Sequence, residues 1–327
     1  MTPERLLRAL ADGEPHSGED LAREFGVTRA AVWKQVAHLA EWGLEVEALA
    51  GVGYRLARRV ELLDAAALRA ALSARAAGRV GRLEVFTELG STNRELLERA
   101  APKREVLDVC IAEYQTAGRG RRGRRWSTPL GAGLCLSAAW QFADTPPGLS
   151  ALTLALGVVV RRAVAAVTNV DVALKWPNDL VWDERKLGGI LLELTAEAQG
   201  GCHVVAGIGL NVDLPPKLLR TLSDWPRGAV DLATATGVPP SRTALAAALI
   251  GELAELFAGY ATDGFQPYRA DWRAADFLRG RRVTLDDADG TVSGTALGIQ
   301  ADGALLIETA NGARRRVTAG DVSVRSG

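Results

Sequence analysis

Residues 118–125 read GRGRRGRR and follow an apolar run that ends near Glu113, so a basic, glycine-rich loop lies just after a predicted strand. A dinucleotide-binding turn with this glycine spacing must open a helix, whereas the sequence WSTP follows at 126–129. A P-loop needs Lys-Ser/Thr where this chain has Arg124 and Arg125. Glycines allow close backbone approach and guanidinium groups bond phosphate or carboxylate, so the segment predicts an anion-binding loop. The alternative is a solvated basic loop or a DNA contact.

The segments around this loop alternate between predicted strands and helices from about residue 64 to residue 272. Apolar runs predict strands at 83–86, 109–113, 134–140, 172–175, 180–182, 190–194 and 204–208, and helical spacing predicts helices near 93–100, 149–167 and 242–259. A hairpin-like turn at Asp183 and Glu184 indicates that much of the sheet is antiparallel or mixed. The sequence therefore predicts an α+β domain over residues 63–272.

Smaller domains flank this one. Residues 1–56 predict three short helices, with Thr28 capping the third, and then two strands around a glycine turn, which is the pattern of a winged helix-turn-helix domain at residues 1–62. The C-terminal stretch alternates apolar and polar residues between Asp-Gly and Asn-Gly turns, with strands at 283–285, 292–299, 305–307 and 322–324. It predicts a small SH3-like β-barrel over residues 273–327.

Composition limits the class of protein. The 327 residues are 48% hydrophobic, and 39 basic side chains balance 39 acidic ones, which excludes global disorder and a protein that merely coats nucleic acid. The longest apolar run, 151–160, is too short to span a membrane, and the N-terminus has no signal-peptide pattern. The three cysteines have no metal-ligand spacing. We therefore expect a cytoplasmic protein that does not contact a membrane.

Four further motifs can carry chemistry. KWPND at 175–179 and KLGGIL at 186–191 contain two of only five lysines, and both ammonium groups are expected to face one site. A simple turn and an exposed hairpin lysine explain these two motifs about equally well. GSTN at 90–93 lies at a strand-to-helix junction and suits either a polar ligand or an ordinary helix cap. GIGLN at 207–211 ends a strand with glycines and an amide, and it is a weak signal alone.

Taken together and in this order, the motifs resemble those of the bifunctional biotin protein ligases that also act as repressors of the biotin operon. The matching stretches are GSTN, AEYQTAGRGRRG at 112–123, KWPND, KLGGIL and GIGLN. The resemblance includes the flanking domains and so extends over nearly the whole chain. It implies a central mixed-sheet domain of the biotin/lipoate ligase type.

The resemblance also implies a reaction and a set of site residues. Biotin and ATP, with Mg²⁺, give biotinyl-5′-adenylate, and the biotinyl group then passes to a lysine of the biotin carboxyl carrier protein of acetyl-CoA carboxylase. The catalytic residues are expected to be Arg119, Arg121 and Lys186. The biotin-binding residues are expected to be Ser91, Thr92, Asn93, Gln115, Gly118, Arg119, Gly120, Arg121, Trp126, Lys186 and Gly189. The nucleotide-binding residues are expected to be Arg121, Trp126, Asn178, Lys186, Asn211 and Trp225. Asp179 is expected either to assist Mg²⁺ or to stabilise a turn.

The third N-terminal helix is expected to bind operator DNA of the biotin operon in the major groove. The residues concerned are Thr28, Arg29, Ala30, Ala31, Val32, Trp33, Lys34 and Gln35. Helix-turn-helix proteins commonly bind as dimers, so we expect a homodimer when the adenylate is bound. Three alternatives remain open: a winged helix that binds protein, a biotin-responsive repressor without ligase activity, and a lipoate-type ligase.

Overall fold

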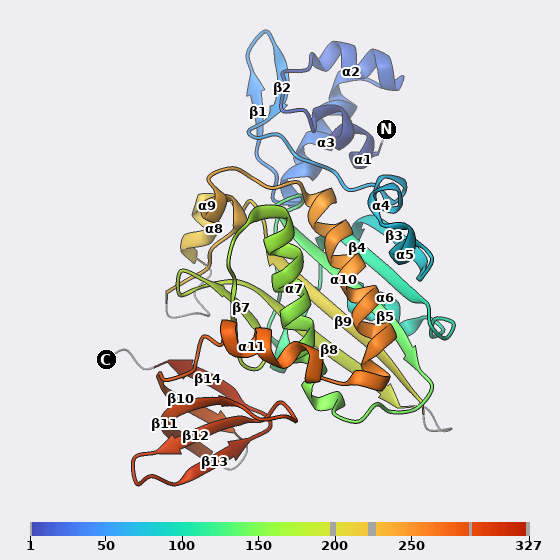
Figure 1. Cartoon of the computed structure of the whole chain (residues 1–327). Helices are drawn as coiled ribbons and strands as arrows, with labels where there is room; N and C mark the ends of the chain where they lie inside the picture. The colour runs from blue at the N-terminus through green and yellow to red at the C-terminus, as the bar shows by residue number, and fades with distance from the viewer. Residues whose placement is uncertain (1, 197–200, 222–226, 288–289, 325–327) are drawn as a thin grey trace.

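The computed structural model describes residues 2–196, 201–221, 227–287 and 290–324. Figure 1 shows three parts in chain order: a helical domain at one end, a central sheet covered by long helices, and a small all-strand domain at the other end. The predicted α+β class, with its winged helix-turn-helix, mixed-sheet and C-terminal β parts, is confirmed.

The N-terminal domain consists of α1 (Pro3–Leu10), α2 (Gly18–Phe25), α3 (Arg29–Glu41) and the hairpin β1 (Val46–Leu49) and β2 (Gly53–Leu56). Ser17 and Thr28 cap α2 and α3 by accepting hydrogen bonds from backbone N–H groups of their first turns. The apolar faces of the helices form a separate core, which also receives Leu130 from the central domain. The side chain of Leu130 is fully buried, and its N–H donates to the Trp42 carbonyl at 2.9 Å.

In the part of the chain that the structure describes, the central sheet has seven strands in the order β3-β4-β5-β9-β8-β7-β6. Their bounds are β3 (Val80–Leu89), β4 (Leu107–Gln115), β5 (Gly133–Phe142), β6 (Ala173–Lys175), β7 (Asp179–Trp182), β8 (Arg185–Ala196) and β9 (Cys202–Asn211). Only β3 and β4 pair in parallel, and the other neighbours pair antiparallel, as the turn at Asp183 predicts. The strands that adjoin residues 118–125, here called the arginine loop, and the KWPND and KLGGIL motifs therefore belong to one sheet.

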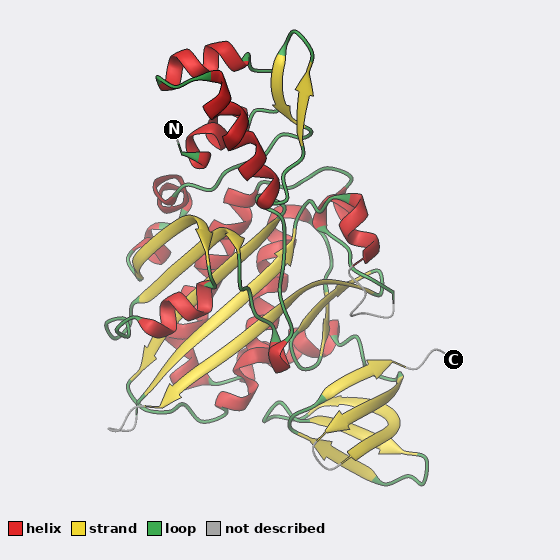
Figure 2. Cartoon of the chain, turned by 180° about the vertical axis from the view of Figure 1, so that it is seen from behind, coloured by secondary structure: helices red, strands yellow, loops and turns green. Residues whose placement is uncertain are grey.

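Two long helices, α7 (Leu152–Thr168) and α10 (Arg242–Asp263), pack against each other and cover one face of this sheet (Figures 1 and 2). By length and composition alone, the segments Leu149–Thr168 and Arg242–Asp263 are apolar enough to cross a membrane, although no single run of apolar residues is that long. Each is more than half buried inside the structure. Both therefore serve here as core helices.

Shorter helices complete the central part: α4 (Ala65–Ala71), α5 (Ala74–Ala77), α6 (Thr92–Glu98), α8 (Pro216–Thr221), α9 (Leu232–Thr236) and α11 (Arg269–Ala275). The C-terminal sheet has the order β13-β12-β11-β10-β14, with all pairs antiparallel. Its strands are β10 (Arg282–Asp287), β11 (Gly290–Ile299), β12 (Leu305–Thr309), β13 (Arg314–Val317) and β14 (Asp321–Val324). The domain boundary proposed after residue 272 lies inside α11, and the first C-terminal strand begins ten residues later, at Arg282.

Candidate active site

A cavity of about 920 Å³ lies between the central sheet, the arginine loop and the C-terminal sheet. It brings together residues that are far apart in the sequence. Of the predicted ligand-binding residues, those that line the cavity are Ser91, Thr92, Asn93, Gln115, Arg119, Gly120, Arg121, Trp126, Asn178, Asp179, Lys186, Gly189 and Asn211. Gly118 does not line it, and Trp225 lies outside the described residues.

One end of the cavity presents neutral polar groups. The Gln115 amide oxygen accepts hydrogen bonds from the Thr92 N–H at 2.9 Å and the Thr92 hydroxyl at 3.2 Å. Ser91, Thr92, Asn93 and Gln115 are all buried, and α6 begins at Thr92, so the first turn of that helix faces the cavity. This end can bond the polar atoms of a neutral ligand ring.

Glycines allow the arginine loop to lie close to the sheet. A Cβ at Gly118 would stand 2.4 Å from the Trp126 carbonyl oxygen, and one at Gly209 would stand 2.4 Å from the Trp126 ring. The loop closes on itself through the Trp126 N–H, which donates to the Gly118 carbonyl at 2.9 Å. Gly118 therefore shapes the loop, and Trp126 forms an apolar wall of the cavity against β9.

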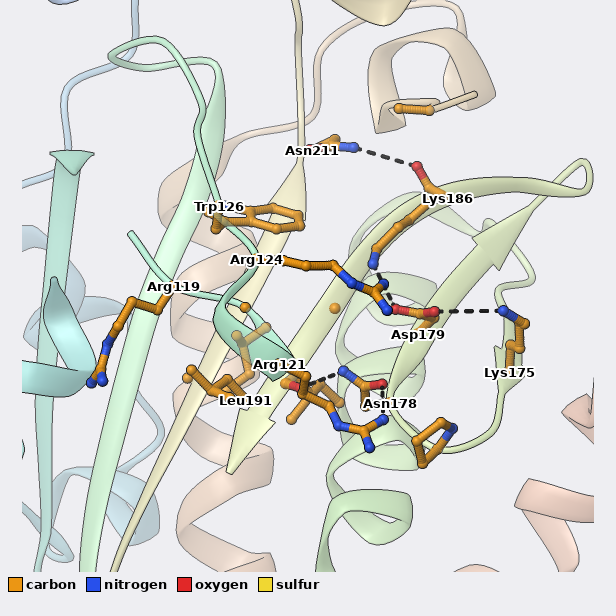
Figure 3. A pocket seen from close by; sticks show the side chains of 18 of the residues that line it. Arg119, Arg121, Arg124, Trp126, Lys175, Asn178, Asp179, Lys186, Leu191 and Asn211 are labelled. Atoms are coloured by element: carbon orange, nitrogen blue, oxygen red, sulfur yellow. Dashed lines mark hydrogen bonds and ion pairs between the residues drawn. The ribbon is translucent and has the colours of Figure 1, made fainter. Parts of the chain in front are cut away.

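The other end is cationic. Figure 3 shows Arg121, Arg124, Lys175 and Lys186 around Asp179 and Asn178. The Lys186 Nζ lies 2.7 Å from Asp179 Oδ1, and the Lys175 Nζ lies 3.9 Å from Asp179 Oδ2. Four cations around one carboxylate leave an excess of positive charge. Such a cluster suits phosphate groups.

The side chains of Asn178 and Asn211 hold this cluster in place. The Arg121 Nη1 donates to the Asn178 amide oxygen at 3.0 Å, and the Asn178 Nδ2 donates to the Ile190 carbonyl at 2.7 Å. Asn211 donates to the carbonyls of Lys186 and Val230, so it fixes the start of β8. Asn178 and Asn211 thus position the cations as well as lining the cavity.

Burial changes the protonation equilibria in the cluster. It lowers the pKa of Lys175 to about 8, although the Asp179 carboxylate opposes this shift. Burial also lowers the pKa of Arg121, again against Asp179. Lys175 is therefore only partly protonated slightly above neutral pH, and it is sensitive to the charge of any ligand.

Asp179 does not fit a resident metal site in this arrangement. Both of its oxygens pair with lysine ammonium groups, and the described residues contain no cluster of three or more His, Cys, Asp or Glu side chains able to hold a metal. The carboxylate instead orients Lys175 and Lys186.

Arg119 lies apart from this cluster and points away from it (Figure 3). Its Nη2 donates to Glu193 Oε2 on β8 at 3.0 Å. Arg124, by contrast, reaches the cluster, although the sequence analysis gave it no role. The two arginines therefore occupy different places from those that the loop sequence alone suggests.

The C-terminal domain also contributes to the cavity, which the sequence did not predict. The Arg121 Nη2 donates to the Gly320 carbonyl at 3.5 Å, and Val322 and Ser323 line the cavity. No sequence signal points to these residues, because their role depends on how the two domains pack. Lys175 was expected to face the same site as Lys186, and the structure brings both ammonium groups to Asp179.

In the N-terminal domain, the exposed face of α3 carries Arg29, Ala30, Trp33 and Lys34. Trp33 is 65% exposed, whereas Val32 is fully buried and faces the domain core. The hairpin arginine Arg55 pairs with Glu47 at 2.7 Å. Arg29 and Lys34 are therefore the basic side chains that α3 offers to a partner.

The cavity combines polar groups that suit a ligand ring with cations that suit phosphate, which is the arrangement expected of a ligase that handles an acid and a nucleotide. The comparisons specify it: residues 85–211 match the biotin/lipoate A/B protein ligase family, residues 279–325 match the biotin protein ligase C-terminal domain, and residues 4–55 match a helix-turn-helix domain. The bifunctional ligase/repressor of Salmonella typhimurium is 37% identical over 99% of this chain and 98% of its own length. The bifunctional ligase/repressor of Bacillus subtilis is 31% identical over 94% of each chain.

Solved structures agree with these matches. A biotin protein ligase from Aquifex aeolicus, determined with biotin and ATP, covers 75% of this chain and 99% of its own, with a TM-score of 0.62 and 26% identity. The chain belongs to the biotin protein ligase family. It is accordingly a biotin ligase that also carries a helix-turn-helix domain of the repressor type.

Proposed function

We propose that this enzyme joins biotin and MgATP to form biotinyl-5′-adenylate and then transfers the biotinyl group to a lysine of the biotin carboxyl carrier protein of acetyl-CoA carboxylase. In the first step a biotin carboxylate oxygen bonds the α-phosphorus of ATP, and pyrophosphate leaves. In the second, the carrier lysine nitrogen bonds the carbonyl carbon, AMP leaves and the nitrogen loses a proton. Both steps belong in the cytoplasm, where ATP is available.

The observation that carries this proposal is one cavity lined both by the neutral polar side chains around Thr92 and Gln115 and by the cations around Asp179. The chemistry requires two anions, a carboxylate and a triphosphate, to approach each other, so fixed cations must offset their repulsion. Lys186 and Arg121 are the catalytic residues that we assign to the reacting oxygens. The Asp179 carboxylate holds Lys186 until an anionic ligand replaces it. Ser91, Thr92 and Gln115 are assigned to the biotin ring.

Mass spectrometry tests this proposal directly. Purified protein is incubated with biotin and MgATP, and an unbiotinylated carrier domain is then added. We expect biotinyl-adenylate first and one biotinyl group on the carrier afterwards. Lys186→Ala and Arg121→Ala should fold normally by circular dichroism but lose adenylate formation at least 100-fold, consistent with loss of about 3 kcal/mol of charge stabilisation. Lys103→Ala, an exposed lysine outside the cavity, is the matched control. Unchanged turnover in both cavity variants would contradict the site assignment.

We further propose that the adenylate-bound protein forms a homodimer whose two N-terminal domains bind operator DNA of the biotin operon and repress it. Support comes from the exposed basic face of α3 and from the bifunctional names of the relatives. Sedimentation with and without biotin plus MgATP, followed by gel-shift assays on DNA upstream of the biotin genes, tests this. A protein that stays monomeric, or that binds the DNA equally well without biotin, would refute the repressor mechanism.

If the carrier gains no biotin while biotin still binds, the biotin-responsive repressor without ligase activity becomes the better interpretation. If lipoate is adenylated in place of biotin, the lipoate-type ligase does. The same mass-spectrometric assay with each acid separates these alternatives.

A further inference from the structure

Glu193 on β8 accepts hydrogen bonds from two cavity residues that come from different parts of the chain. Its Oε2 accepts from the Arg119 Nη2 at 3.0 Å and from the Asn93 Nδ2 at 2.8 Å. Arg119 lies at the start of the arginine loop, and Asn93 lies in the first turn of α6. One carboxylate oxygen therefore joins the loop and the helix that enclose the neutral end of the cavity.

The hydrogen bonds continue from Asn93 to the residues assigned to the biotin ring. The Ser137 hydroxyl bonds the Asn93 amide oxygen at 2.5 Å and the Thr92 hydroxyl at 2.7 Å. Thr92 in turn bonds Gln115 through its N–H and its hydroxyl. Because the amide oxygen of Asn93 faces Ser137, its Nδ2 must face an acceptor, and Glu193 supplies it along with the Leu191 carbonyl.

The sheet is shaped to admit this arrangement. A Cβ at Gly207 on β9 would stand 2.2 Å from the Asn93 amide oxygen. Glycine at this position gives the Asn93 side chain room to lie across the sheet between Ser137 and Glu193. The sheet thus leaves room for this hydrogen-bond network, and each donor in it meets an acceptor.

We propose that Glu193 is a positioning residue for biotin: its carboxylate fixes the Asn93 amide and the first arm of the arginine loop so that Thr92 and Gln115 present a fixed set of partners to the biotin ring. This inference rests on the proposed function of the cavity. Glu193 itself does not line the cavity, so it acts through Arg119 and Asn93. An ionised acceptor bonds both donors more strongly than a neutral one does.

The consequence is specific to one substrate. Removing the carboxylate leaves the Asn93 amide held only by Ser137 and the Leu191 carbonyl, and it removes the bond that ties Arg119 to β8. Biotin is then held less well, and the adenylate escapes sooner. Among the described residues, the cationic cluster around Asp179 shares no hydrogen bond or ion pair with Glu193, so we expect it to continue to bind MgATP. A merely structural role for Glu193 would instead change both Michaelis constants together or lower the melting temperature.

The test is steady-state adenylate formation by Glu193→Ala and Glu193→Gln in the full chain, with KM measured separately for biotin and MgATP. We expect Glu193→Ala to raise KM for biotin at least tenfold and to speed adenylate release, while KM for MgATP changes less than twofold. Glu193→Gln keeps an acceptor oxygen without the charge, so its KM for biotin should lie between those of wild type and Glu193→Ala. Glu255→Ala, which removes a partly exposed glutamate paired with Arg75 and Arg79, is the matched control.

Gly207→Ala provides a second route to the same result. The three atoms nearest to the added methyl group all belong to the Asn93 amide, which it displaces while the Glu193 carboxylate is kept, so KM for biotin should rise in the same direction. An unchanged or lowered KM for biotin in Glu193→Ala, or an equal rise for both substrates, would overturn the inference. Wild-type protein that makes no adenylate would instead refute the proposed function, so the two failures are distinguishable.

Discussion

Glu113 and Arg242 form a buried ion pair whose loss should unfold much of the central domain. The Arg242 Nη2 donates to Glu113 Oε2 at 2.6 Å, and the two side chains are only 3% and 4% exposed. The Leu63 N–H donates to the other Glu113 oxygen at 2.6 Å. Glu113→Ala leaves a buried guanidinium without its counter-charge, at a cost of about 3–5 kcal/mol. It also leaves the Leu63 N–H unpaired, which costs about 1–3 kcal/mol more.

Urea unfolding followed by tryptophan fluorescence and far-ultraviolet circular dichroism measures this loss. A loss of that size approaches the whole stability of an ordinary domain, about 5–15 kcal/mol, so Glu113→Ala is expected to be largely unfolded at 37 °C. Glu113→Gln keeps an acceptor for Leu63 and should lose about 3 kcal/mol. Glu255→Ala, which breaks partly exposed pairs, should lose less than about 1 kcal/mol. A loss below about 1 kcal/mol in both Glu113 variants would refute the reasoning.

Two further predictions concern charge. Burial lowers the pKa of Lys175 to about 8, so this cation loses its charge as pH rises through 8, and KM for MgATP should increase several-fold between pH 7 and 9. Lys175→Arg stays charged and should flatten that rise, whereas equal pH profiles for the two proteins would contradict the assignment. In the N-terminal domain, Arg29→Ala combined with Lys34→Ala should abolish operator binding in gel shifts while carrier biotinylation stays within twofold of wild type. Loss of both activities would argue that the two domains do not act separately.

The sequence predicts most helices and strands because burial of one side or of the whole element leaves a recognisable pattern of apolar residues. The inner strands β5 and β9 are mostly apolar and almost wholly buried, and Thr28 marks the start of α3 by its capping side chain. Strand β13 was missed for a physical reason: Arg314, Arg315 and Arg316 are all exposed on the edge of the C-terminal sheet, so they show no alternation. Helices α4 and α5 are short and alanine-rich, and they lack a strong apolar period.

For the site, the sequence predicts the residues that meet but not the direction of their side chains. Residue types and spacing predict which segments meet, and the cavity does bring together the motifs at Ser91, Arg121, Lys186 and Asn211. They do not predict where each side chain points within an irregular loop. Arg122 adopts a positive φ of 55° and Gly123 one of 73°, so the chain reverses between Arg121 and Arg124, and no helical or strand period relates their directions.

The direction of each arginine side chain depends on its hydrogen-bond partners elsewhere in the fold. Arg119 donates to Glu193, which is 74 residues away in sequence, and so points away from the cation cluster. Arg121 donates to the Asn178 amide oxygen and the Gly320 carbonyl, which hold it within the cluster. Each of these acceptors comes from a separate segment whose position depends on the packing of the sheet and of the C-terminal domain. A loop of five arginines therefore predicts an anion site from sequence. The division of those arginines between holding the loop and facing the cation cluster depends on the folded chain.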